Sequence, residues 1–271
     1  MLGKLIKHDF RATWKVMVSL DAVLVVLGIM AAVVLQTIPH VEDSFGMGLF
    51  MFSCIGLFYI GVIAANIVSL IFLVIRYYRN LYTPEGYLTF TLPVKTDMII
   101  HSKVITGSVW MLLCYLFTFI SLVIAGAGFV AATDISRADL LNAMREGFSI
   151  LGFGDPGFTA IMVFVILLTP FAGIVSMYFC ISVGQLWQNH KILGAVLCCI
   201  GLYILNQIVT QVVFFASGFW SLMSGSGADI DATFGTLYKN MMLNISIVTF
   251  VEAVIFYIVC IFITRSKINL D

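Results

Sequence analysis

Residues 47–75 read MGLFMFSCIGLFYIGVIAANIVSLIFLVI, an apolar run of 29 residues without one charged side chain. A helix needs about 20 such residues to cross the hydrocarbon core of a bilayer. The whole chain has the same character, since 61% of its 271 residues are hydrophobic, 10% are charged and its mean hydropathy is +1.08. Soluble domains carry about 25% charged residues. The composition therefore excludes a soluble enzyme, a disordered chain, a nucleic-acid binder and a secreted disulfide scaffold, and it indicates a polytopic membrane protein.

Charged residues divide the chain into six apolar intervals, each long enough for one span. Within lipid the backbone must satisfy its own hydrogen bonds, so we expect the spans to be helices. The short alternating strands of a membrane barrel are not visible. We predict an all-α integral membrane protein with a single transmembrane domain over residues 17–264. Its six predicted spans lie near 17–38, 47–75, 101–132, 158–184, 192–217 and 242–264.

Six spans place both chain termini on the same side of the membrane. That side carries 11 of the 14 lysine and arginine residues, whereas the opposite side carries three of them together with eight acidic residues. Loops rich in lysine and arginine stay in the cytoplasm. We therefore predict an N-in, C-in topology, with residues 265–271 as a cytoplasmic tail.

Residues 1–16, MLGKLIKHDFRATWKV, combine an apolar face with a basic face at helical spacing. This pattern predicts an amphipathic helix that lies in the interface, with its basic side toward anionic lipid headgroups. Such a helix either anchors the orientation of the chain or acts as an elbow that transmits motion from a cytosolic partner to the first span. The pattern alone favours neither role.

The loop between the second and third spans contains the signature of a short helix. Thr83-Pro84-Glu85 combines an N-cap residue, a proline at the first helical position and an acid in the first turn. Pro93 ends whatever helix begins there. The segment 82–92 therefore predicts a helix on the cytoplasmic surface that presents an acid among aromatic side chains. Such a surface suits docking into a groove of another protein, although an interfacial loop that caps the bundle is the alternative.

Three features resemble the permease subunits of type-2 family bacterial ABC exporters, which are small six-span proteins. They are the basic amphipathic start, the loop with Glu85-Gly86-Tyr87, and Leu92-Pro93-Val94 followed by a helix start and Lys103. The resemblance implies that 82–92 is a coupling helix that docks on a separate ABC-type ATPase, with Glu85 at the joint. The implied coupling residues are Tyr82, Thr83, Glu85, Gly86 and Tyr87.

The same resemblance implies several properties of the assembled transporter. The permease pairs with a second copy of itself or with a homologous permease, and the transport pathway runs between the two. It resides in the bacterial plasma membrane, and ATP with Mg²⁺ is bound by the partner ATPase. Substrates in this group often include antimicrobial peptides. A lipid or a hydrophobic drug fits the mostly apolar spans equally well.

The chain lacks the sequence motifs of a catalytic protein. It contains no G-x-x-x-x-G-K-[ST] phosphate loop, no H-E-x-x-H, no G-x-S-x-G and no Cys/His metal cluster. We therefore expect that it is not an enzyme by itself and binds no cofactor or metal. If it moves a substrate uphill, the energy comes from a partner ATPase or from an ion gradient.

Two acidic residues, Asp21 and Glu252, lie within or close to the predicted spans. Ionisable residues inside a membrane are functional candidates by default. Asp21 is expected to form a salt bridge with Lys15 or Arg76. No other span holds a basic residue that could pair with Glu252 near the middle of span six. Glu252 is therefore expected to be protonated or bonded to an amide or hydroxyl of a neighbouring helix, and a proton relay is the functional alternative.

Uncharged polar residues also occur inside the spans, and they either line a pathway or bind helices together. Span five carries one polar stripe with Asn206, Gln207, Thr210 and Gln211, and with Tyr203 one turn before Gln207, while span two offers Asn66 and Ser69. Small residues four apart permit close helix packing. These pairs are Gly28 and Ala32, Ala65 and Ser69, Gly128 and Ala132, and Ala172 and Ser176. A further amphipathic helix is predicted outside the membrane over 134–151.

Three functions remain open from the sequence. The first is an exporter permease that an ATPase drives through the 82–92 loop to move an amphipathic peptide, lipid or drug out of the cell. The second is a transporter driven by an ion gradient through Glu252. The third is a membrane scaffold or immunity protein that transports nothing.

Overall fold

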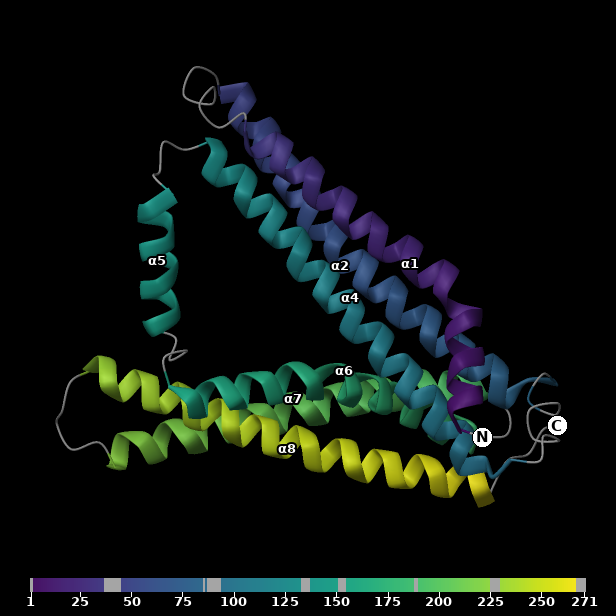
Figure 1. Cartoon of the computed structure of the whole chain (residues 1–271). Coiled ribbons are helices and arrows are strands. Elements are labelled where there is room, and N and C mark those ends of the chain that lie inside the picture. Colours follow the sequence, from purple (N-terminus) through teal and green to yellow (C-terminus); the bar gives the residue numbers. More distant parts are fainter. Residues whose placement is uncertain are drawn as a thin grey trace. The chain divides into compact units, whose positions relative to one another are not determined.

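Every regular element in the described part of the chain is an α-helix. The computed structural model describes residues 2–36, 45–84, 86, 94–132, 137–150, 155–187, 190–224 and 230–266. The helices, labelled in Figure 1, are α1 (Leu2–Leu35), α2 (Phe45–Tyr82), α4 (Thr96–Ala132), α5 (Arg137–Ile150), α6 (Pro156–Gly184), α7 (Lys191–Ser224) and α8 (Ile230–Ser266). The predicted all-α fold is confirmed over these residues.

Six of these helices are long and apolar enough to cross a membrane. The apolar stretches are Leu2–Leu35, Gly46–Tyr82, Thr96–Ala132, Pro156–Gly184, Lys191–Ser217 and Tyr238–Arg265, counted over the described residues. All six predicted spans are therefore helical, and the protein is a multi-pass helical membrane protein. The helix predicted over 134–151 is present as α5.

Several helices run past the boundaries predicted for the spans. The α2 helix has 38 residues and continues to Tyr82, and α4 already begins at Thr96. Polar and apolar residues form the same backbone hydrogen bonds in a helix. A helix therefore need not end where the chain leaves the hydrocarbon core. The α1 helix is continuous from Leu2, so no break separates the predicted 1–16 helix from the first span.

The start of α6 follows the capping signal in its sequence. Asp155 is the N-cap and accepts a hydrogen bond of 2.9 Å from the backbone N–H of Gly157, while Pro156 occupies the first turn. Lys239 of α8 forms an ion pair with Asp155. The hydrogen bonds from the Lys239 ammonium and the Gly157 N–H hold the pKa of Asp155 below its ordinary value. The pair is therefore charged at neutral pH.

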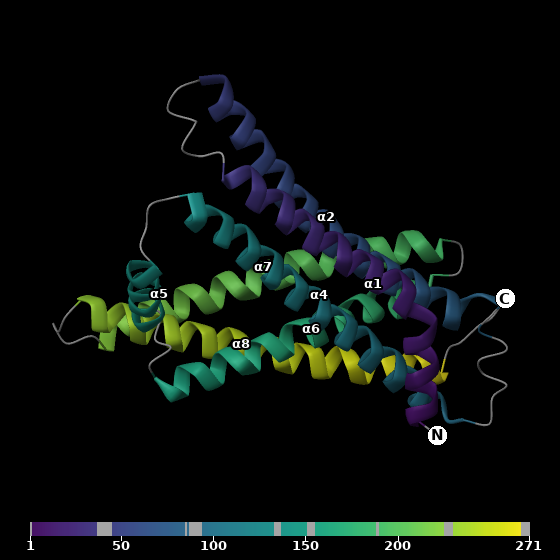
Figure 2. The ribbon, with the colours of Figure 1, turned by 45° about the horizontal axis from the view of Figure 1, so that its top comes forward.

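The chain divides into two compact units. The first contains Met1–Arg76 and His101–Asn142, and the second contains Tyr77–Ile100 and Ala143–Asp271. In the first unit α1 and α2 run side by side in both views, and contacts with α4 complete a three-helix core (Figures 1 and 2). The buried cluster of this core comprises Leu24, Ala31, Phe58, Val62, Ala65, Cys114 and Ala125.

Two glycines bring α1 and α4 into close contact. A Cβ atom on Gly28 would lie 2.7 Å from the backbone oxygen of Ser121, and a Cβ atom on Gly128 would overlap the backbone of Ala32. The sequence predicted close packing at both glycines. The small residues meet across the two helices, so that Gly128 of α4 faces Ala32 of α1.

The second unit is built around α6, which packs against both α7 and α8. Aromatic stacking joins its helices, since the ring centroids of Tyr77 and Tyr178 are 3.8 Å apart and those of Phe179 and Phe256 are 4.7 Å apart. The α7 helix is by far the least covered. Only 6% of its most apolar window is buried, compared with 22–33% in the other five spans.

The close approach of α1 and α4 predicts opposite effects of two alanine substitutions on the same helix. Gly128→Ala should lower the free energy of unfolding by about 1–3 kcal/mol, because the new methyl group overlaps Ala32. Gly126→Ala should be neutral or slightly stabilising, because a Cβ atom there meets nothing within 4 Å and alanine favours the helix. Thermal denaturation of the purified variants in nanodiscs measures both. Equal melting temperatures would contradict the packing described here.

Candidate functional site

A polar pocket lies among α6, α7 and α8 in the second unit, and we call it the α6–α8 pocket. Its volume is about 420 Å³. Eight of its lining residues are glycine, alanine, methionine, valine or isoleucine. Its polar lining residues are Thr169, Ser176, Asn206, Thr210, Thr249 and Glu252. A mostly apolar pocket with a few convergent polar groups is the usual form of a ligand site.

Glu252 of α8 and Asn206 of α7 meet in this pocket. With its amide nitrogen turned toward α8, Asn206 donates hydrogen bonds of 2.9 Å to Oε2 and 3.3 Å to Oε1 of Glu252. The opposite orientation would place the amide oxygen against the carboxylate, so the bonding pattern selects this one for the ionised acid. An amide carries both donors and an acceptor, and it can therefore also bond a protonated carboxyl group.

No basic side chain lines the pocket among the described residues. Lys239 and Arg265 each lie thirteen residues from Glu252 along α8, which is about 20 Å of helix. Lys239 pairs with Asp155, and Arg265 pairs with Asp97 through its Nε at 2.6 Å and through Nη2. The cations at both ends of the span thus have acidic partners, whereas Glu252 in its middle is bonded only to a neutral amide.

A second pocket continues the first along α7 and α8. The two pockets share Val213 and Val248, and the second is also lined by Ser217, Asn240 and Asn244. Asn240 and Asn244 are one turn apart and share one face of α8, whereas Glu252 points about 120° away from Asn240 around the helix. The sequence analysis missed the two asparagines of α8, although their spacing was a sufficient signal.

The polar stripe predicted on span five divides between two faces of α7. Asn206 and Thr210 line the α6–α8 pocket. Tyr203, Gln207 and Gln211 do not line it and are exposed. Neighbouring residues on a helix point about 100° apart, so residues 206 and 207 cannot share one narrow stripe.

Asn66 and Ser69 of α2 bond within the core of the first unit. Asn66 Nδ2 donates to Thr118 Oγ1 at 2.9 Å, and Ser69 Oγ donates to the carbonyl of Ala65 at 2.9 Å. The thiol of Cys114 donates to Asn66 Oδ1 at 3.5 Å and to Ser69 Oγ at 3.6 Å. These contacts bind α2 to α4, which was one of the two roles open from the sequence.

Asp21 is buried in the first unit, with 2% of its surface exposed. Its Oδ1 has no hydrogen-bond partner among the described residues. Neither expected salt bridge forms, because Lys15 is exposed on the opposite face of α1 and Arg76 donates instead to the carbonyl of Ala12. The buried face of α1 repeats every three or four residues and includes Asp21 but excludes Lys15.

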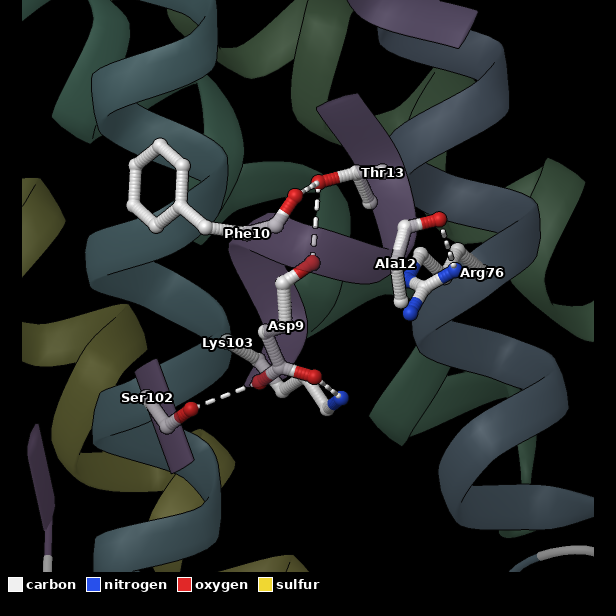
Figure 3. A network of polar contacts seen from close by, with 7 residues as sticks. All are labelled: Asp9, Phe10, Ala12, Thr13, Arg76, Ser102 and Lys103. Carbon is white, nitrogen blue, oxygen red and sulfur yellow. Dashed lines mark hydrogen bonds and ion pairs between the residues drawn. The ribbon is translucent and has the colours of Figure 1, made fainter. Parts of the chain in front are cut away.

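An ion pair between the start of α1 and the start of α4 was not anticipated from the sequence. Asp9 pairs with Lys103 and also accepts a hydrogen bond of 2.6 Å from Ser102 Oγ (Figure 3). The side chains of Asp9 and Lys103 are only 7% and 11% exposed. Thr13 Oγ1 donates to the carbonyl of Asp9 one turn earlier in the same helix. The first turns of α1 are thus bonded to α4 through buried charges.

Only part of the predicted coupling segment belongs to the described residues. Tyr82, Thr83 and Gly86 are described, whereas Glu85 and Tyr87 lie outside. The Tyr82 hydroxyl is 2.9 Å from Ser182 Oγ of α6, and Thr83 Oγ1 donates to the carbonyl of Arg79 at 2.5 Å. The Gly86 N–H donates to the carbonyl of Thr83 at 2.7 Å and closes a turn directly after α2. Tyr82 therefore binds α6 instead of facing outward.

Comparison with known proteins adds no family assignment. No protein-family model, curated protein or solved structure matches this chain. Within the described residues, no three His, Cys, Asp or Glu side chains are grouped closely enough to hold a metal ion. The class that fold and composition define is a six-span helical membrane protein with an acid-containing pocket.

The Asp9–Lys103 pair makes a prediction for stability. Asp9→Leu or Lys103→Met alone should lower the free energy of unfolding by about 3–5 kcal/mol, because each leaves one charge buried without a partner. The double variant should lose much less than the sum, since both charges are removed together. Denaturant titration in mixed micelles measures the cycle. The control is Lys4→Met, which removes an exposed lysine of α1. Additive losses of stability in the double variant would contradict the pairing of Asp9 with Lys103.

Proposed function

We propose that this chain is the permease subunit of an ATP-driven exporter of the ABC type in the bacterial plasma membrane. The observation that carries the proposal is the linkage between α2 and α4. Both helices run past the predicted edges of their spans, to Tyr82 and from Thr96, and a tight turn over Thr83–Gly86 follows α2 directly. The segment between them is therefore held at both ends by rigid helices, as a handle for a partner must be.

The proposed mechanism divides the work between two kinds of subunit. The partner ATPase holds ATP and Mg²⁺ and closes upon binding them, while this chain supplies the pathway and binds no nucleotide. The segment 82–92 docks on the ATPase, with Glu85 at the joint. Movement of this segment displaces the ends of α2 and α4, and the Asp9–Lys103 pair carries the displacement of α4 to α1.

The orientation with both termini in the cytoplasm is part of the proposal. The basic residues at the start of α1, which include Lys4, Lys7 and Arg11, are exposed, while Asp9 and Thr13 on the other face are buried. An exposed basic row at the end of an apolar helix binds anionic headgroups and stays on the cytoplasmic side. This row supports the cytoplasmic placement of residues 1–16, whereas their role as an interfacial elbow rests on the amphipathic sequence pattern alone.

Pairing with a second permease copy or a homologous permease is supported by the exposed face of α7. This face carries Tyr203, Gln207 and Gln211 on a helix that is scarcely buried within the chain. Amide side chains in hydrocarbon seek hydrogen-bond partners on another helix. A second permease against this face would satisfy them. The substrate is amphipathic, as a peptide, lipid or drug would be, because the α6–α8 pocket and the spans are mostly apolar.

The docking role of Glu85 makes a prediction for complex formation. The chain should co-purify with a nucleotide-hydrolysing subunit from its native membranes, and Glu85→Arg should abolish this association by reversing the charge at the joint. Glu146→Arg is the matched control, since it reverses an exposed acid of α5 that is proposed to lie on the other side of the membrane. Association that survives Glu85→Arg would overturn the docking assignment.

The Glu252–Asn206 contact favours one alternative, a transporter driven by an ion gradient. An acid in the middle of a span, here bonded to an amide, is a candidate for a proton relay. In that case Glu252→Gln should abolish gradient-driven uptake or efflux of substrate by proteoliposomes without any ATPase. Transport that depends on ATP and on the second subunit would reject this alternative.

A further inference from the structure

We propose that the α6–α8 pocket binds a hydrophobic monovalent cation, such as an amphipathic amine or a quaternary onium ion. The charged group lies beside Glu252 and the apolar body lies against α6 and α7. As a substrate assignment this inference rests on the proposed export function. As a binding site it rests on the geometry of the second unit alone, and it can be tested without a partner ATPase.

The first argument is the charge of the pocket. An ionised carboxylate in the middle of a span is unfavourable unless a positive charge compensates it. Asn206 supplies two hydrogen bonds to Glu252 but no net charge. The other polar side chains of the lining are neutral hydroxyls. A bound cation would provide the missing charge, and an anion would be repelled.

The second argument is that the chain's own cations at both ends of this span already have partners. Lys239 is bound to Asp155 and Arg265 to Asp97. Each lies about 20 Å from Glu252 along α8, well beyond the reach of its side chain. The first unit differs in this respect, because there Lys103 meets Asp9 directly. When Glu252 is ionised, its counter-charge therefore has to come from a molecule outside the chain.

The third argument is the shape and chemistry of the walls. The volume of about 420 Å³ falls in the range of roughly 300–1,000 Å³ that suits small organic molecules. Among the described residues, Glu252 is the one carboxylate in the lining, so the pocket lacks the several charged oxygen ligands that a divalent metal ion prefers. At Gly173 a side chain would meet nothing within 4 Å, so the wall is open at this position. These features fit a cation whose charge is shielded by hydrocarbon groups.

The probe for this site is tetraphenylphosphonium, a hydrophobic monovalent cation, with the isosteric anion tetraphenylborate as its counterpart. Equilibrium binding is measured on the purified chain in nanodiscs of zwitterionic lipid, with empty nanodiscs subtracted. We expect saturable binding of the cation that Glu252→Gln weakens at least tenfold. Glu146→Gln, the same chemical change at an exposed acid of α5, should leave the affinity unchanged.

A second variant tests the pocket without altering its charge. Gly173→Leu should also weaken the binding of tetraphenylphosphonium at least tenfold, because its side chain enters open space in the pocket, and it should not unfold the helix. Absence of saturable cation binding, equal binding by Glu252→Gln, or equally tight chain-dependent binding of tetraphenylborate would each overturn the inference. Loss of ATPase association on Glu85→Arg is measured separately, so failure of this site and failure of the exporter proposal are distinguishable.

Discussion

The arrangement of charge in this protein follows from the cost of an ionised group in hydrocarbon. Three ion pairs lie near the ends of the spans: Asp9–Lys103 where α1 meets α4, and Lys239–Asp155 and Arg265–Asp97 at the two ends of the span in α8. Of these three pairs only Asp9–Lys103 is buried, and a buried pair contributes less to net stability than it costs when one member is removed. Each pair joins the ends of two helices, α1 to α4 and the two ends of the α8 span to Asp155 and Asp97.

Asp21 and Glu252, the two acids inside the spans, meet the cost of a charge in hydrocarbon in different surroundings. Asp21 is enclosed in the core of the first unit, and one of its oxygens has no partner among the described residues. Glu252 instead borders a pocket and is bonded to Asn206. An enclosed acid without a cation is neutral or strained, and it has little access to a ligand. An acid beside a pocket can exchange its partner, which is why we place function at Glu252.

The helical spans could be predicted from the sequence because lipid leaves few alternatives. Apolar length and the spacing of charges were sufficient for all six, and Gly28 and Gly128, which make close contacts, were among the small residues that permit close packing. The partners of side chains were not predictable in the same way. The expected partners of Asp21 lay close in sequence or at the end of the next span, yet its burial depends on the rotation of α1 about its axis. The pairing of Lys103 with Asp9 was likewise not anticipated, because the two residues are distant in sequence.

The candidate site was predictable only in part for the same reason, because the contacts of side chains depend on how the helices pack. A polar stripe over residues 203–211 was visible in the sequence. Which of its residues line a pocket depends on how α7 packs against α6 and α8, and in the structure these residues are Asn206 and Thr210. Glu252 was recognised because a charge inside a span is conspicuous. Asn240 and Asn244 were not, because asparagines near the end of a span are common. They line the second pocket, which shares Val213 and Val248 with the pocket that contains Glu252.

The buried face of α1 constrains how motion can pass through the first unit. It runs without interruption from Asp9 through Met17 to Ala31 and packs along the length of the helix. The first turns of α1 are therefore not a free arm, because Asp9 joins them to α4 while the close contact at Gly28 joins the same two helices farther along. Two such attachments on rigid helices oppose rotation of one against the other. A displacement applied to the start of α4 must then move α1 along with it, and the proposed handle acts on a pair of helices.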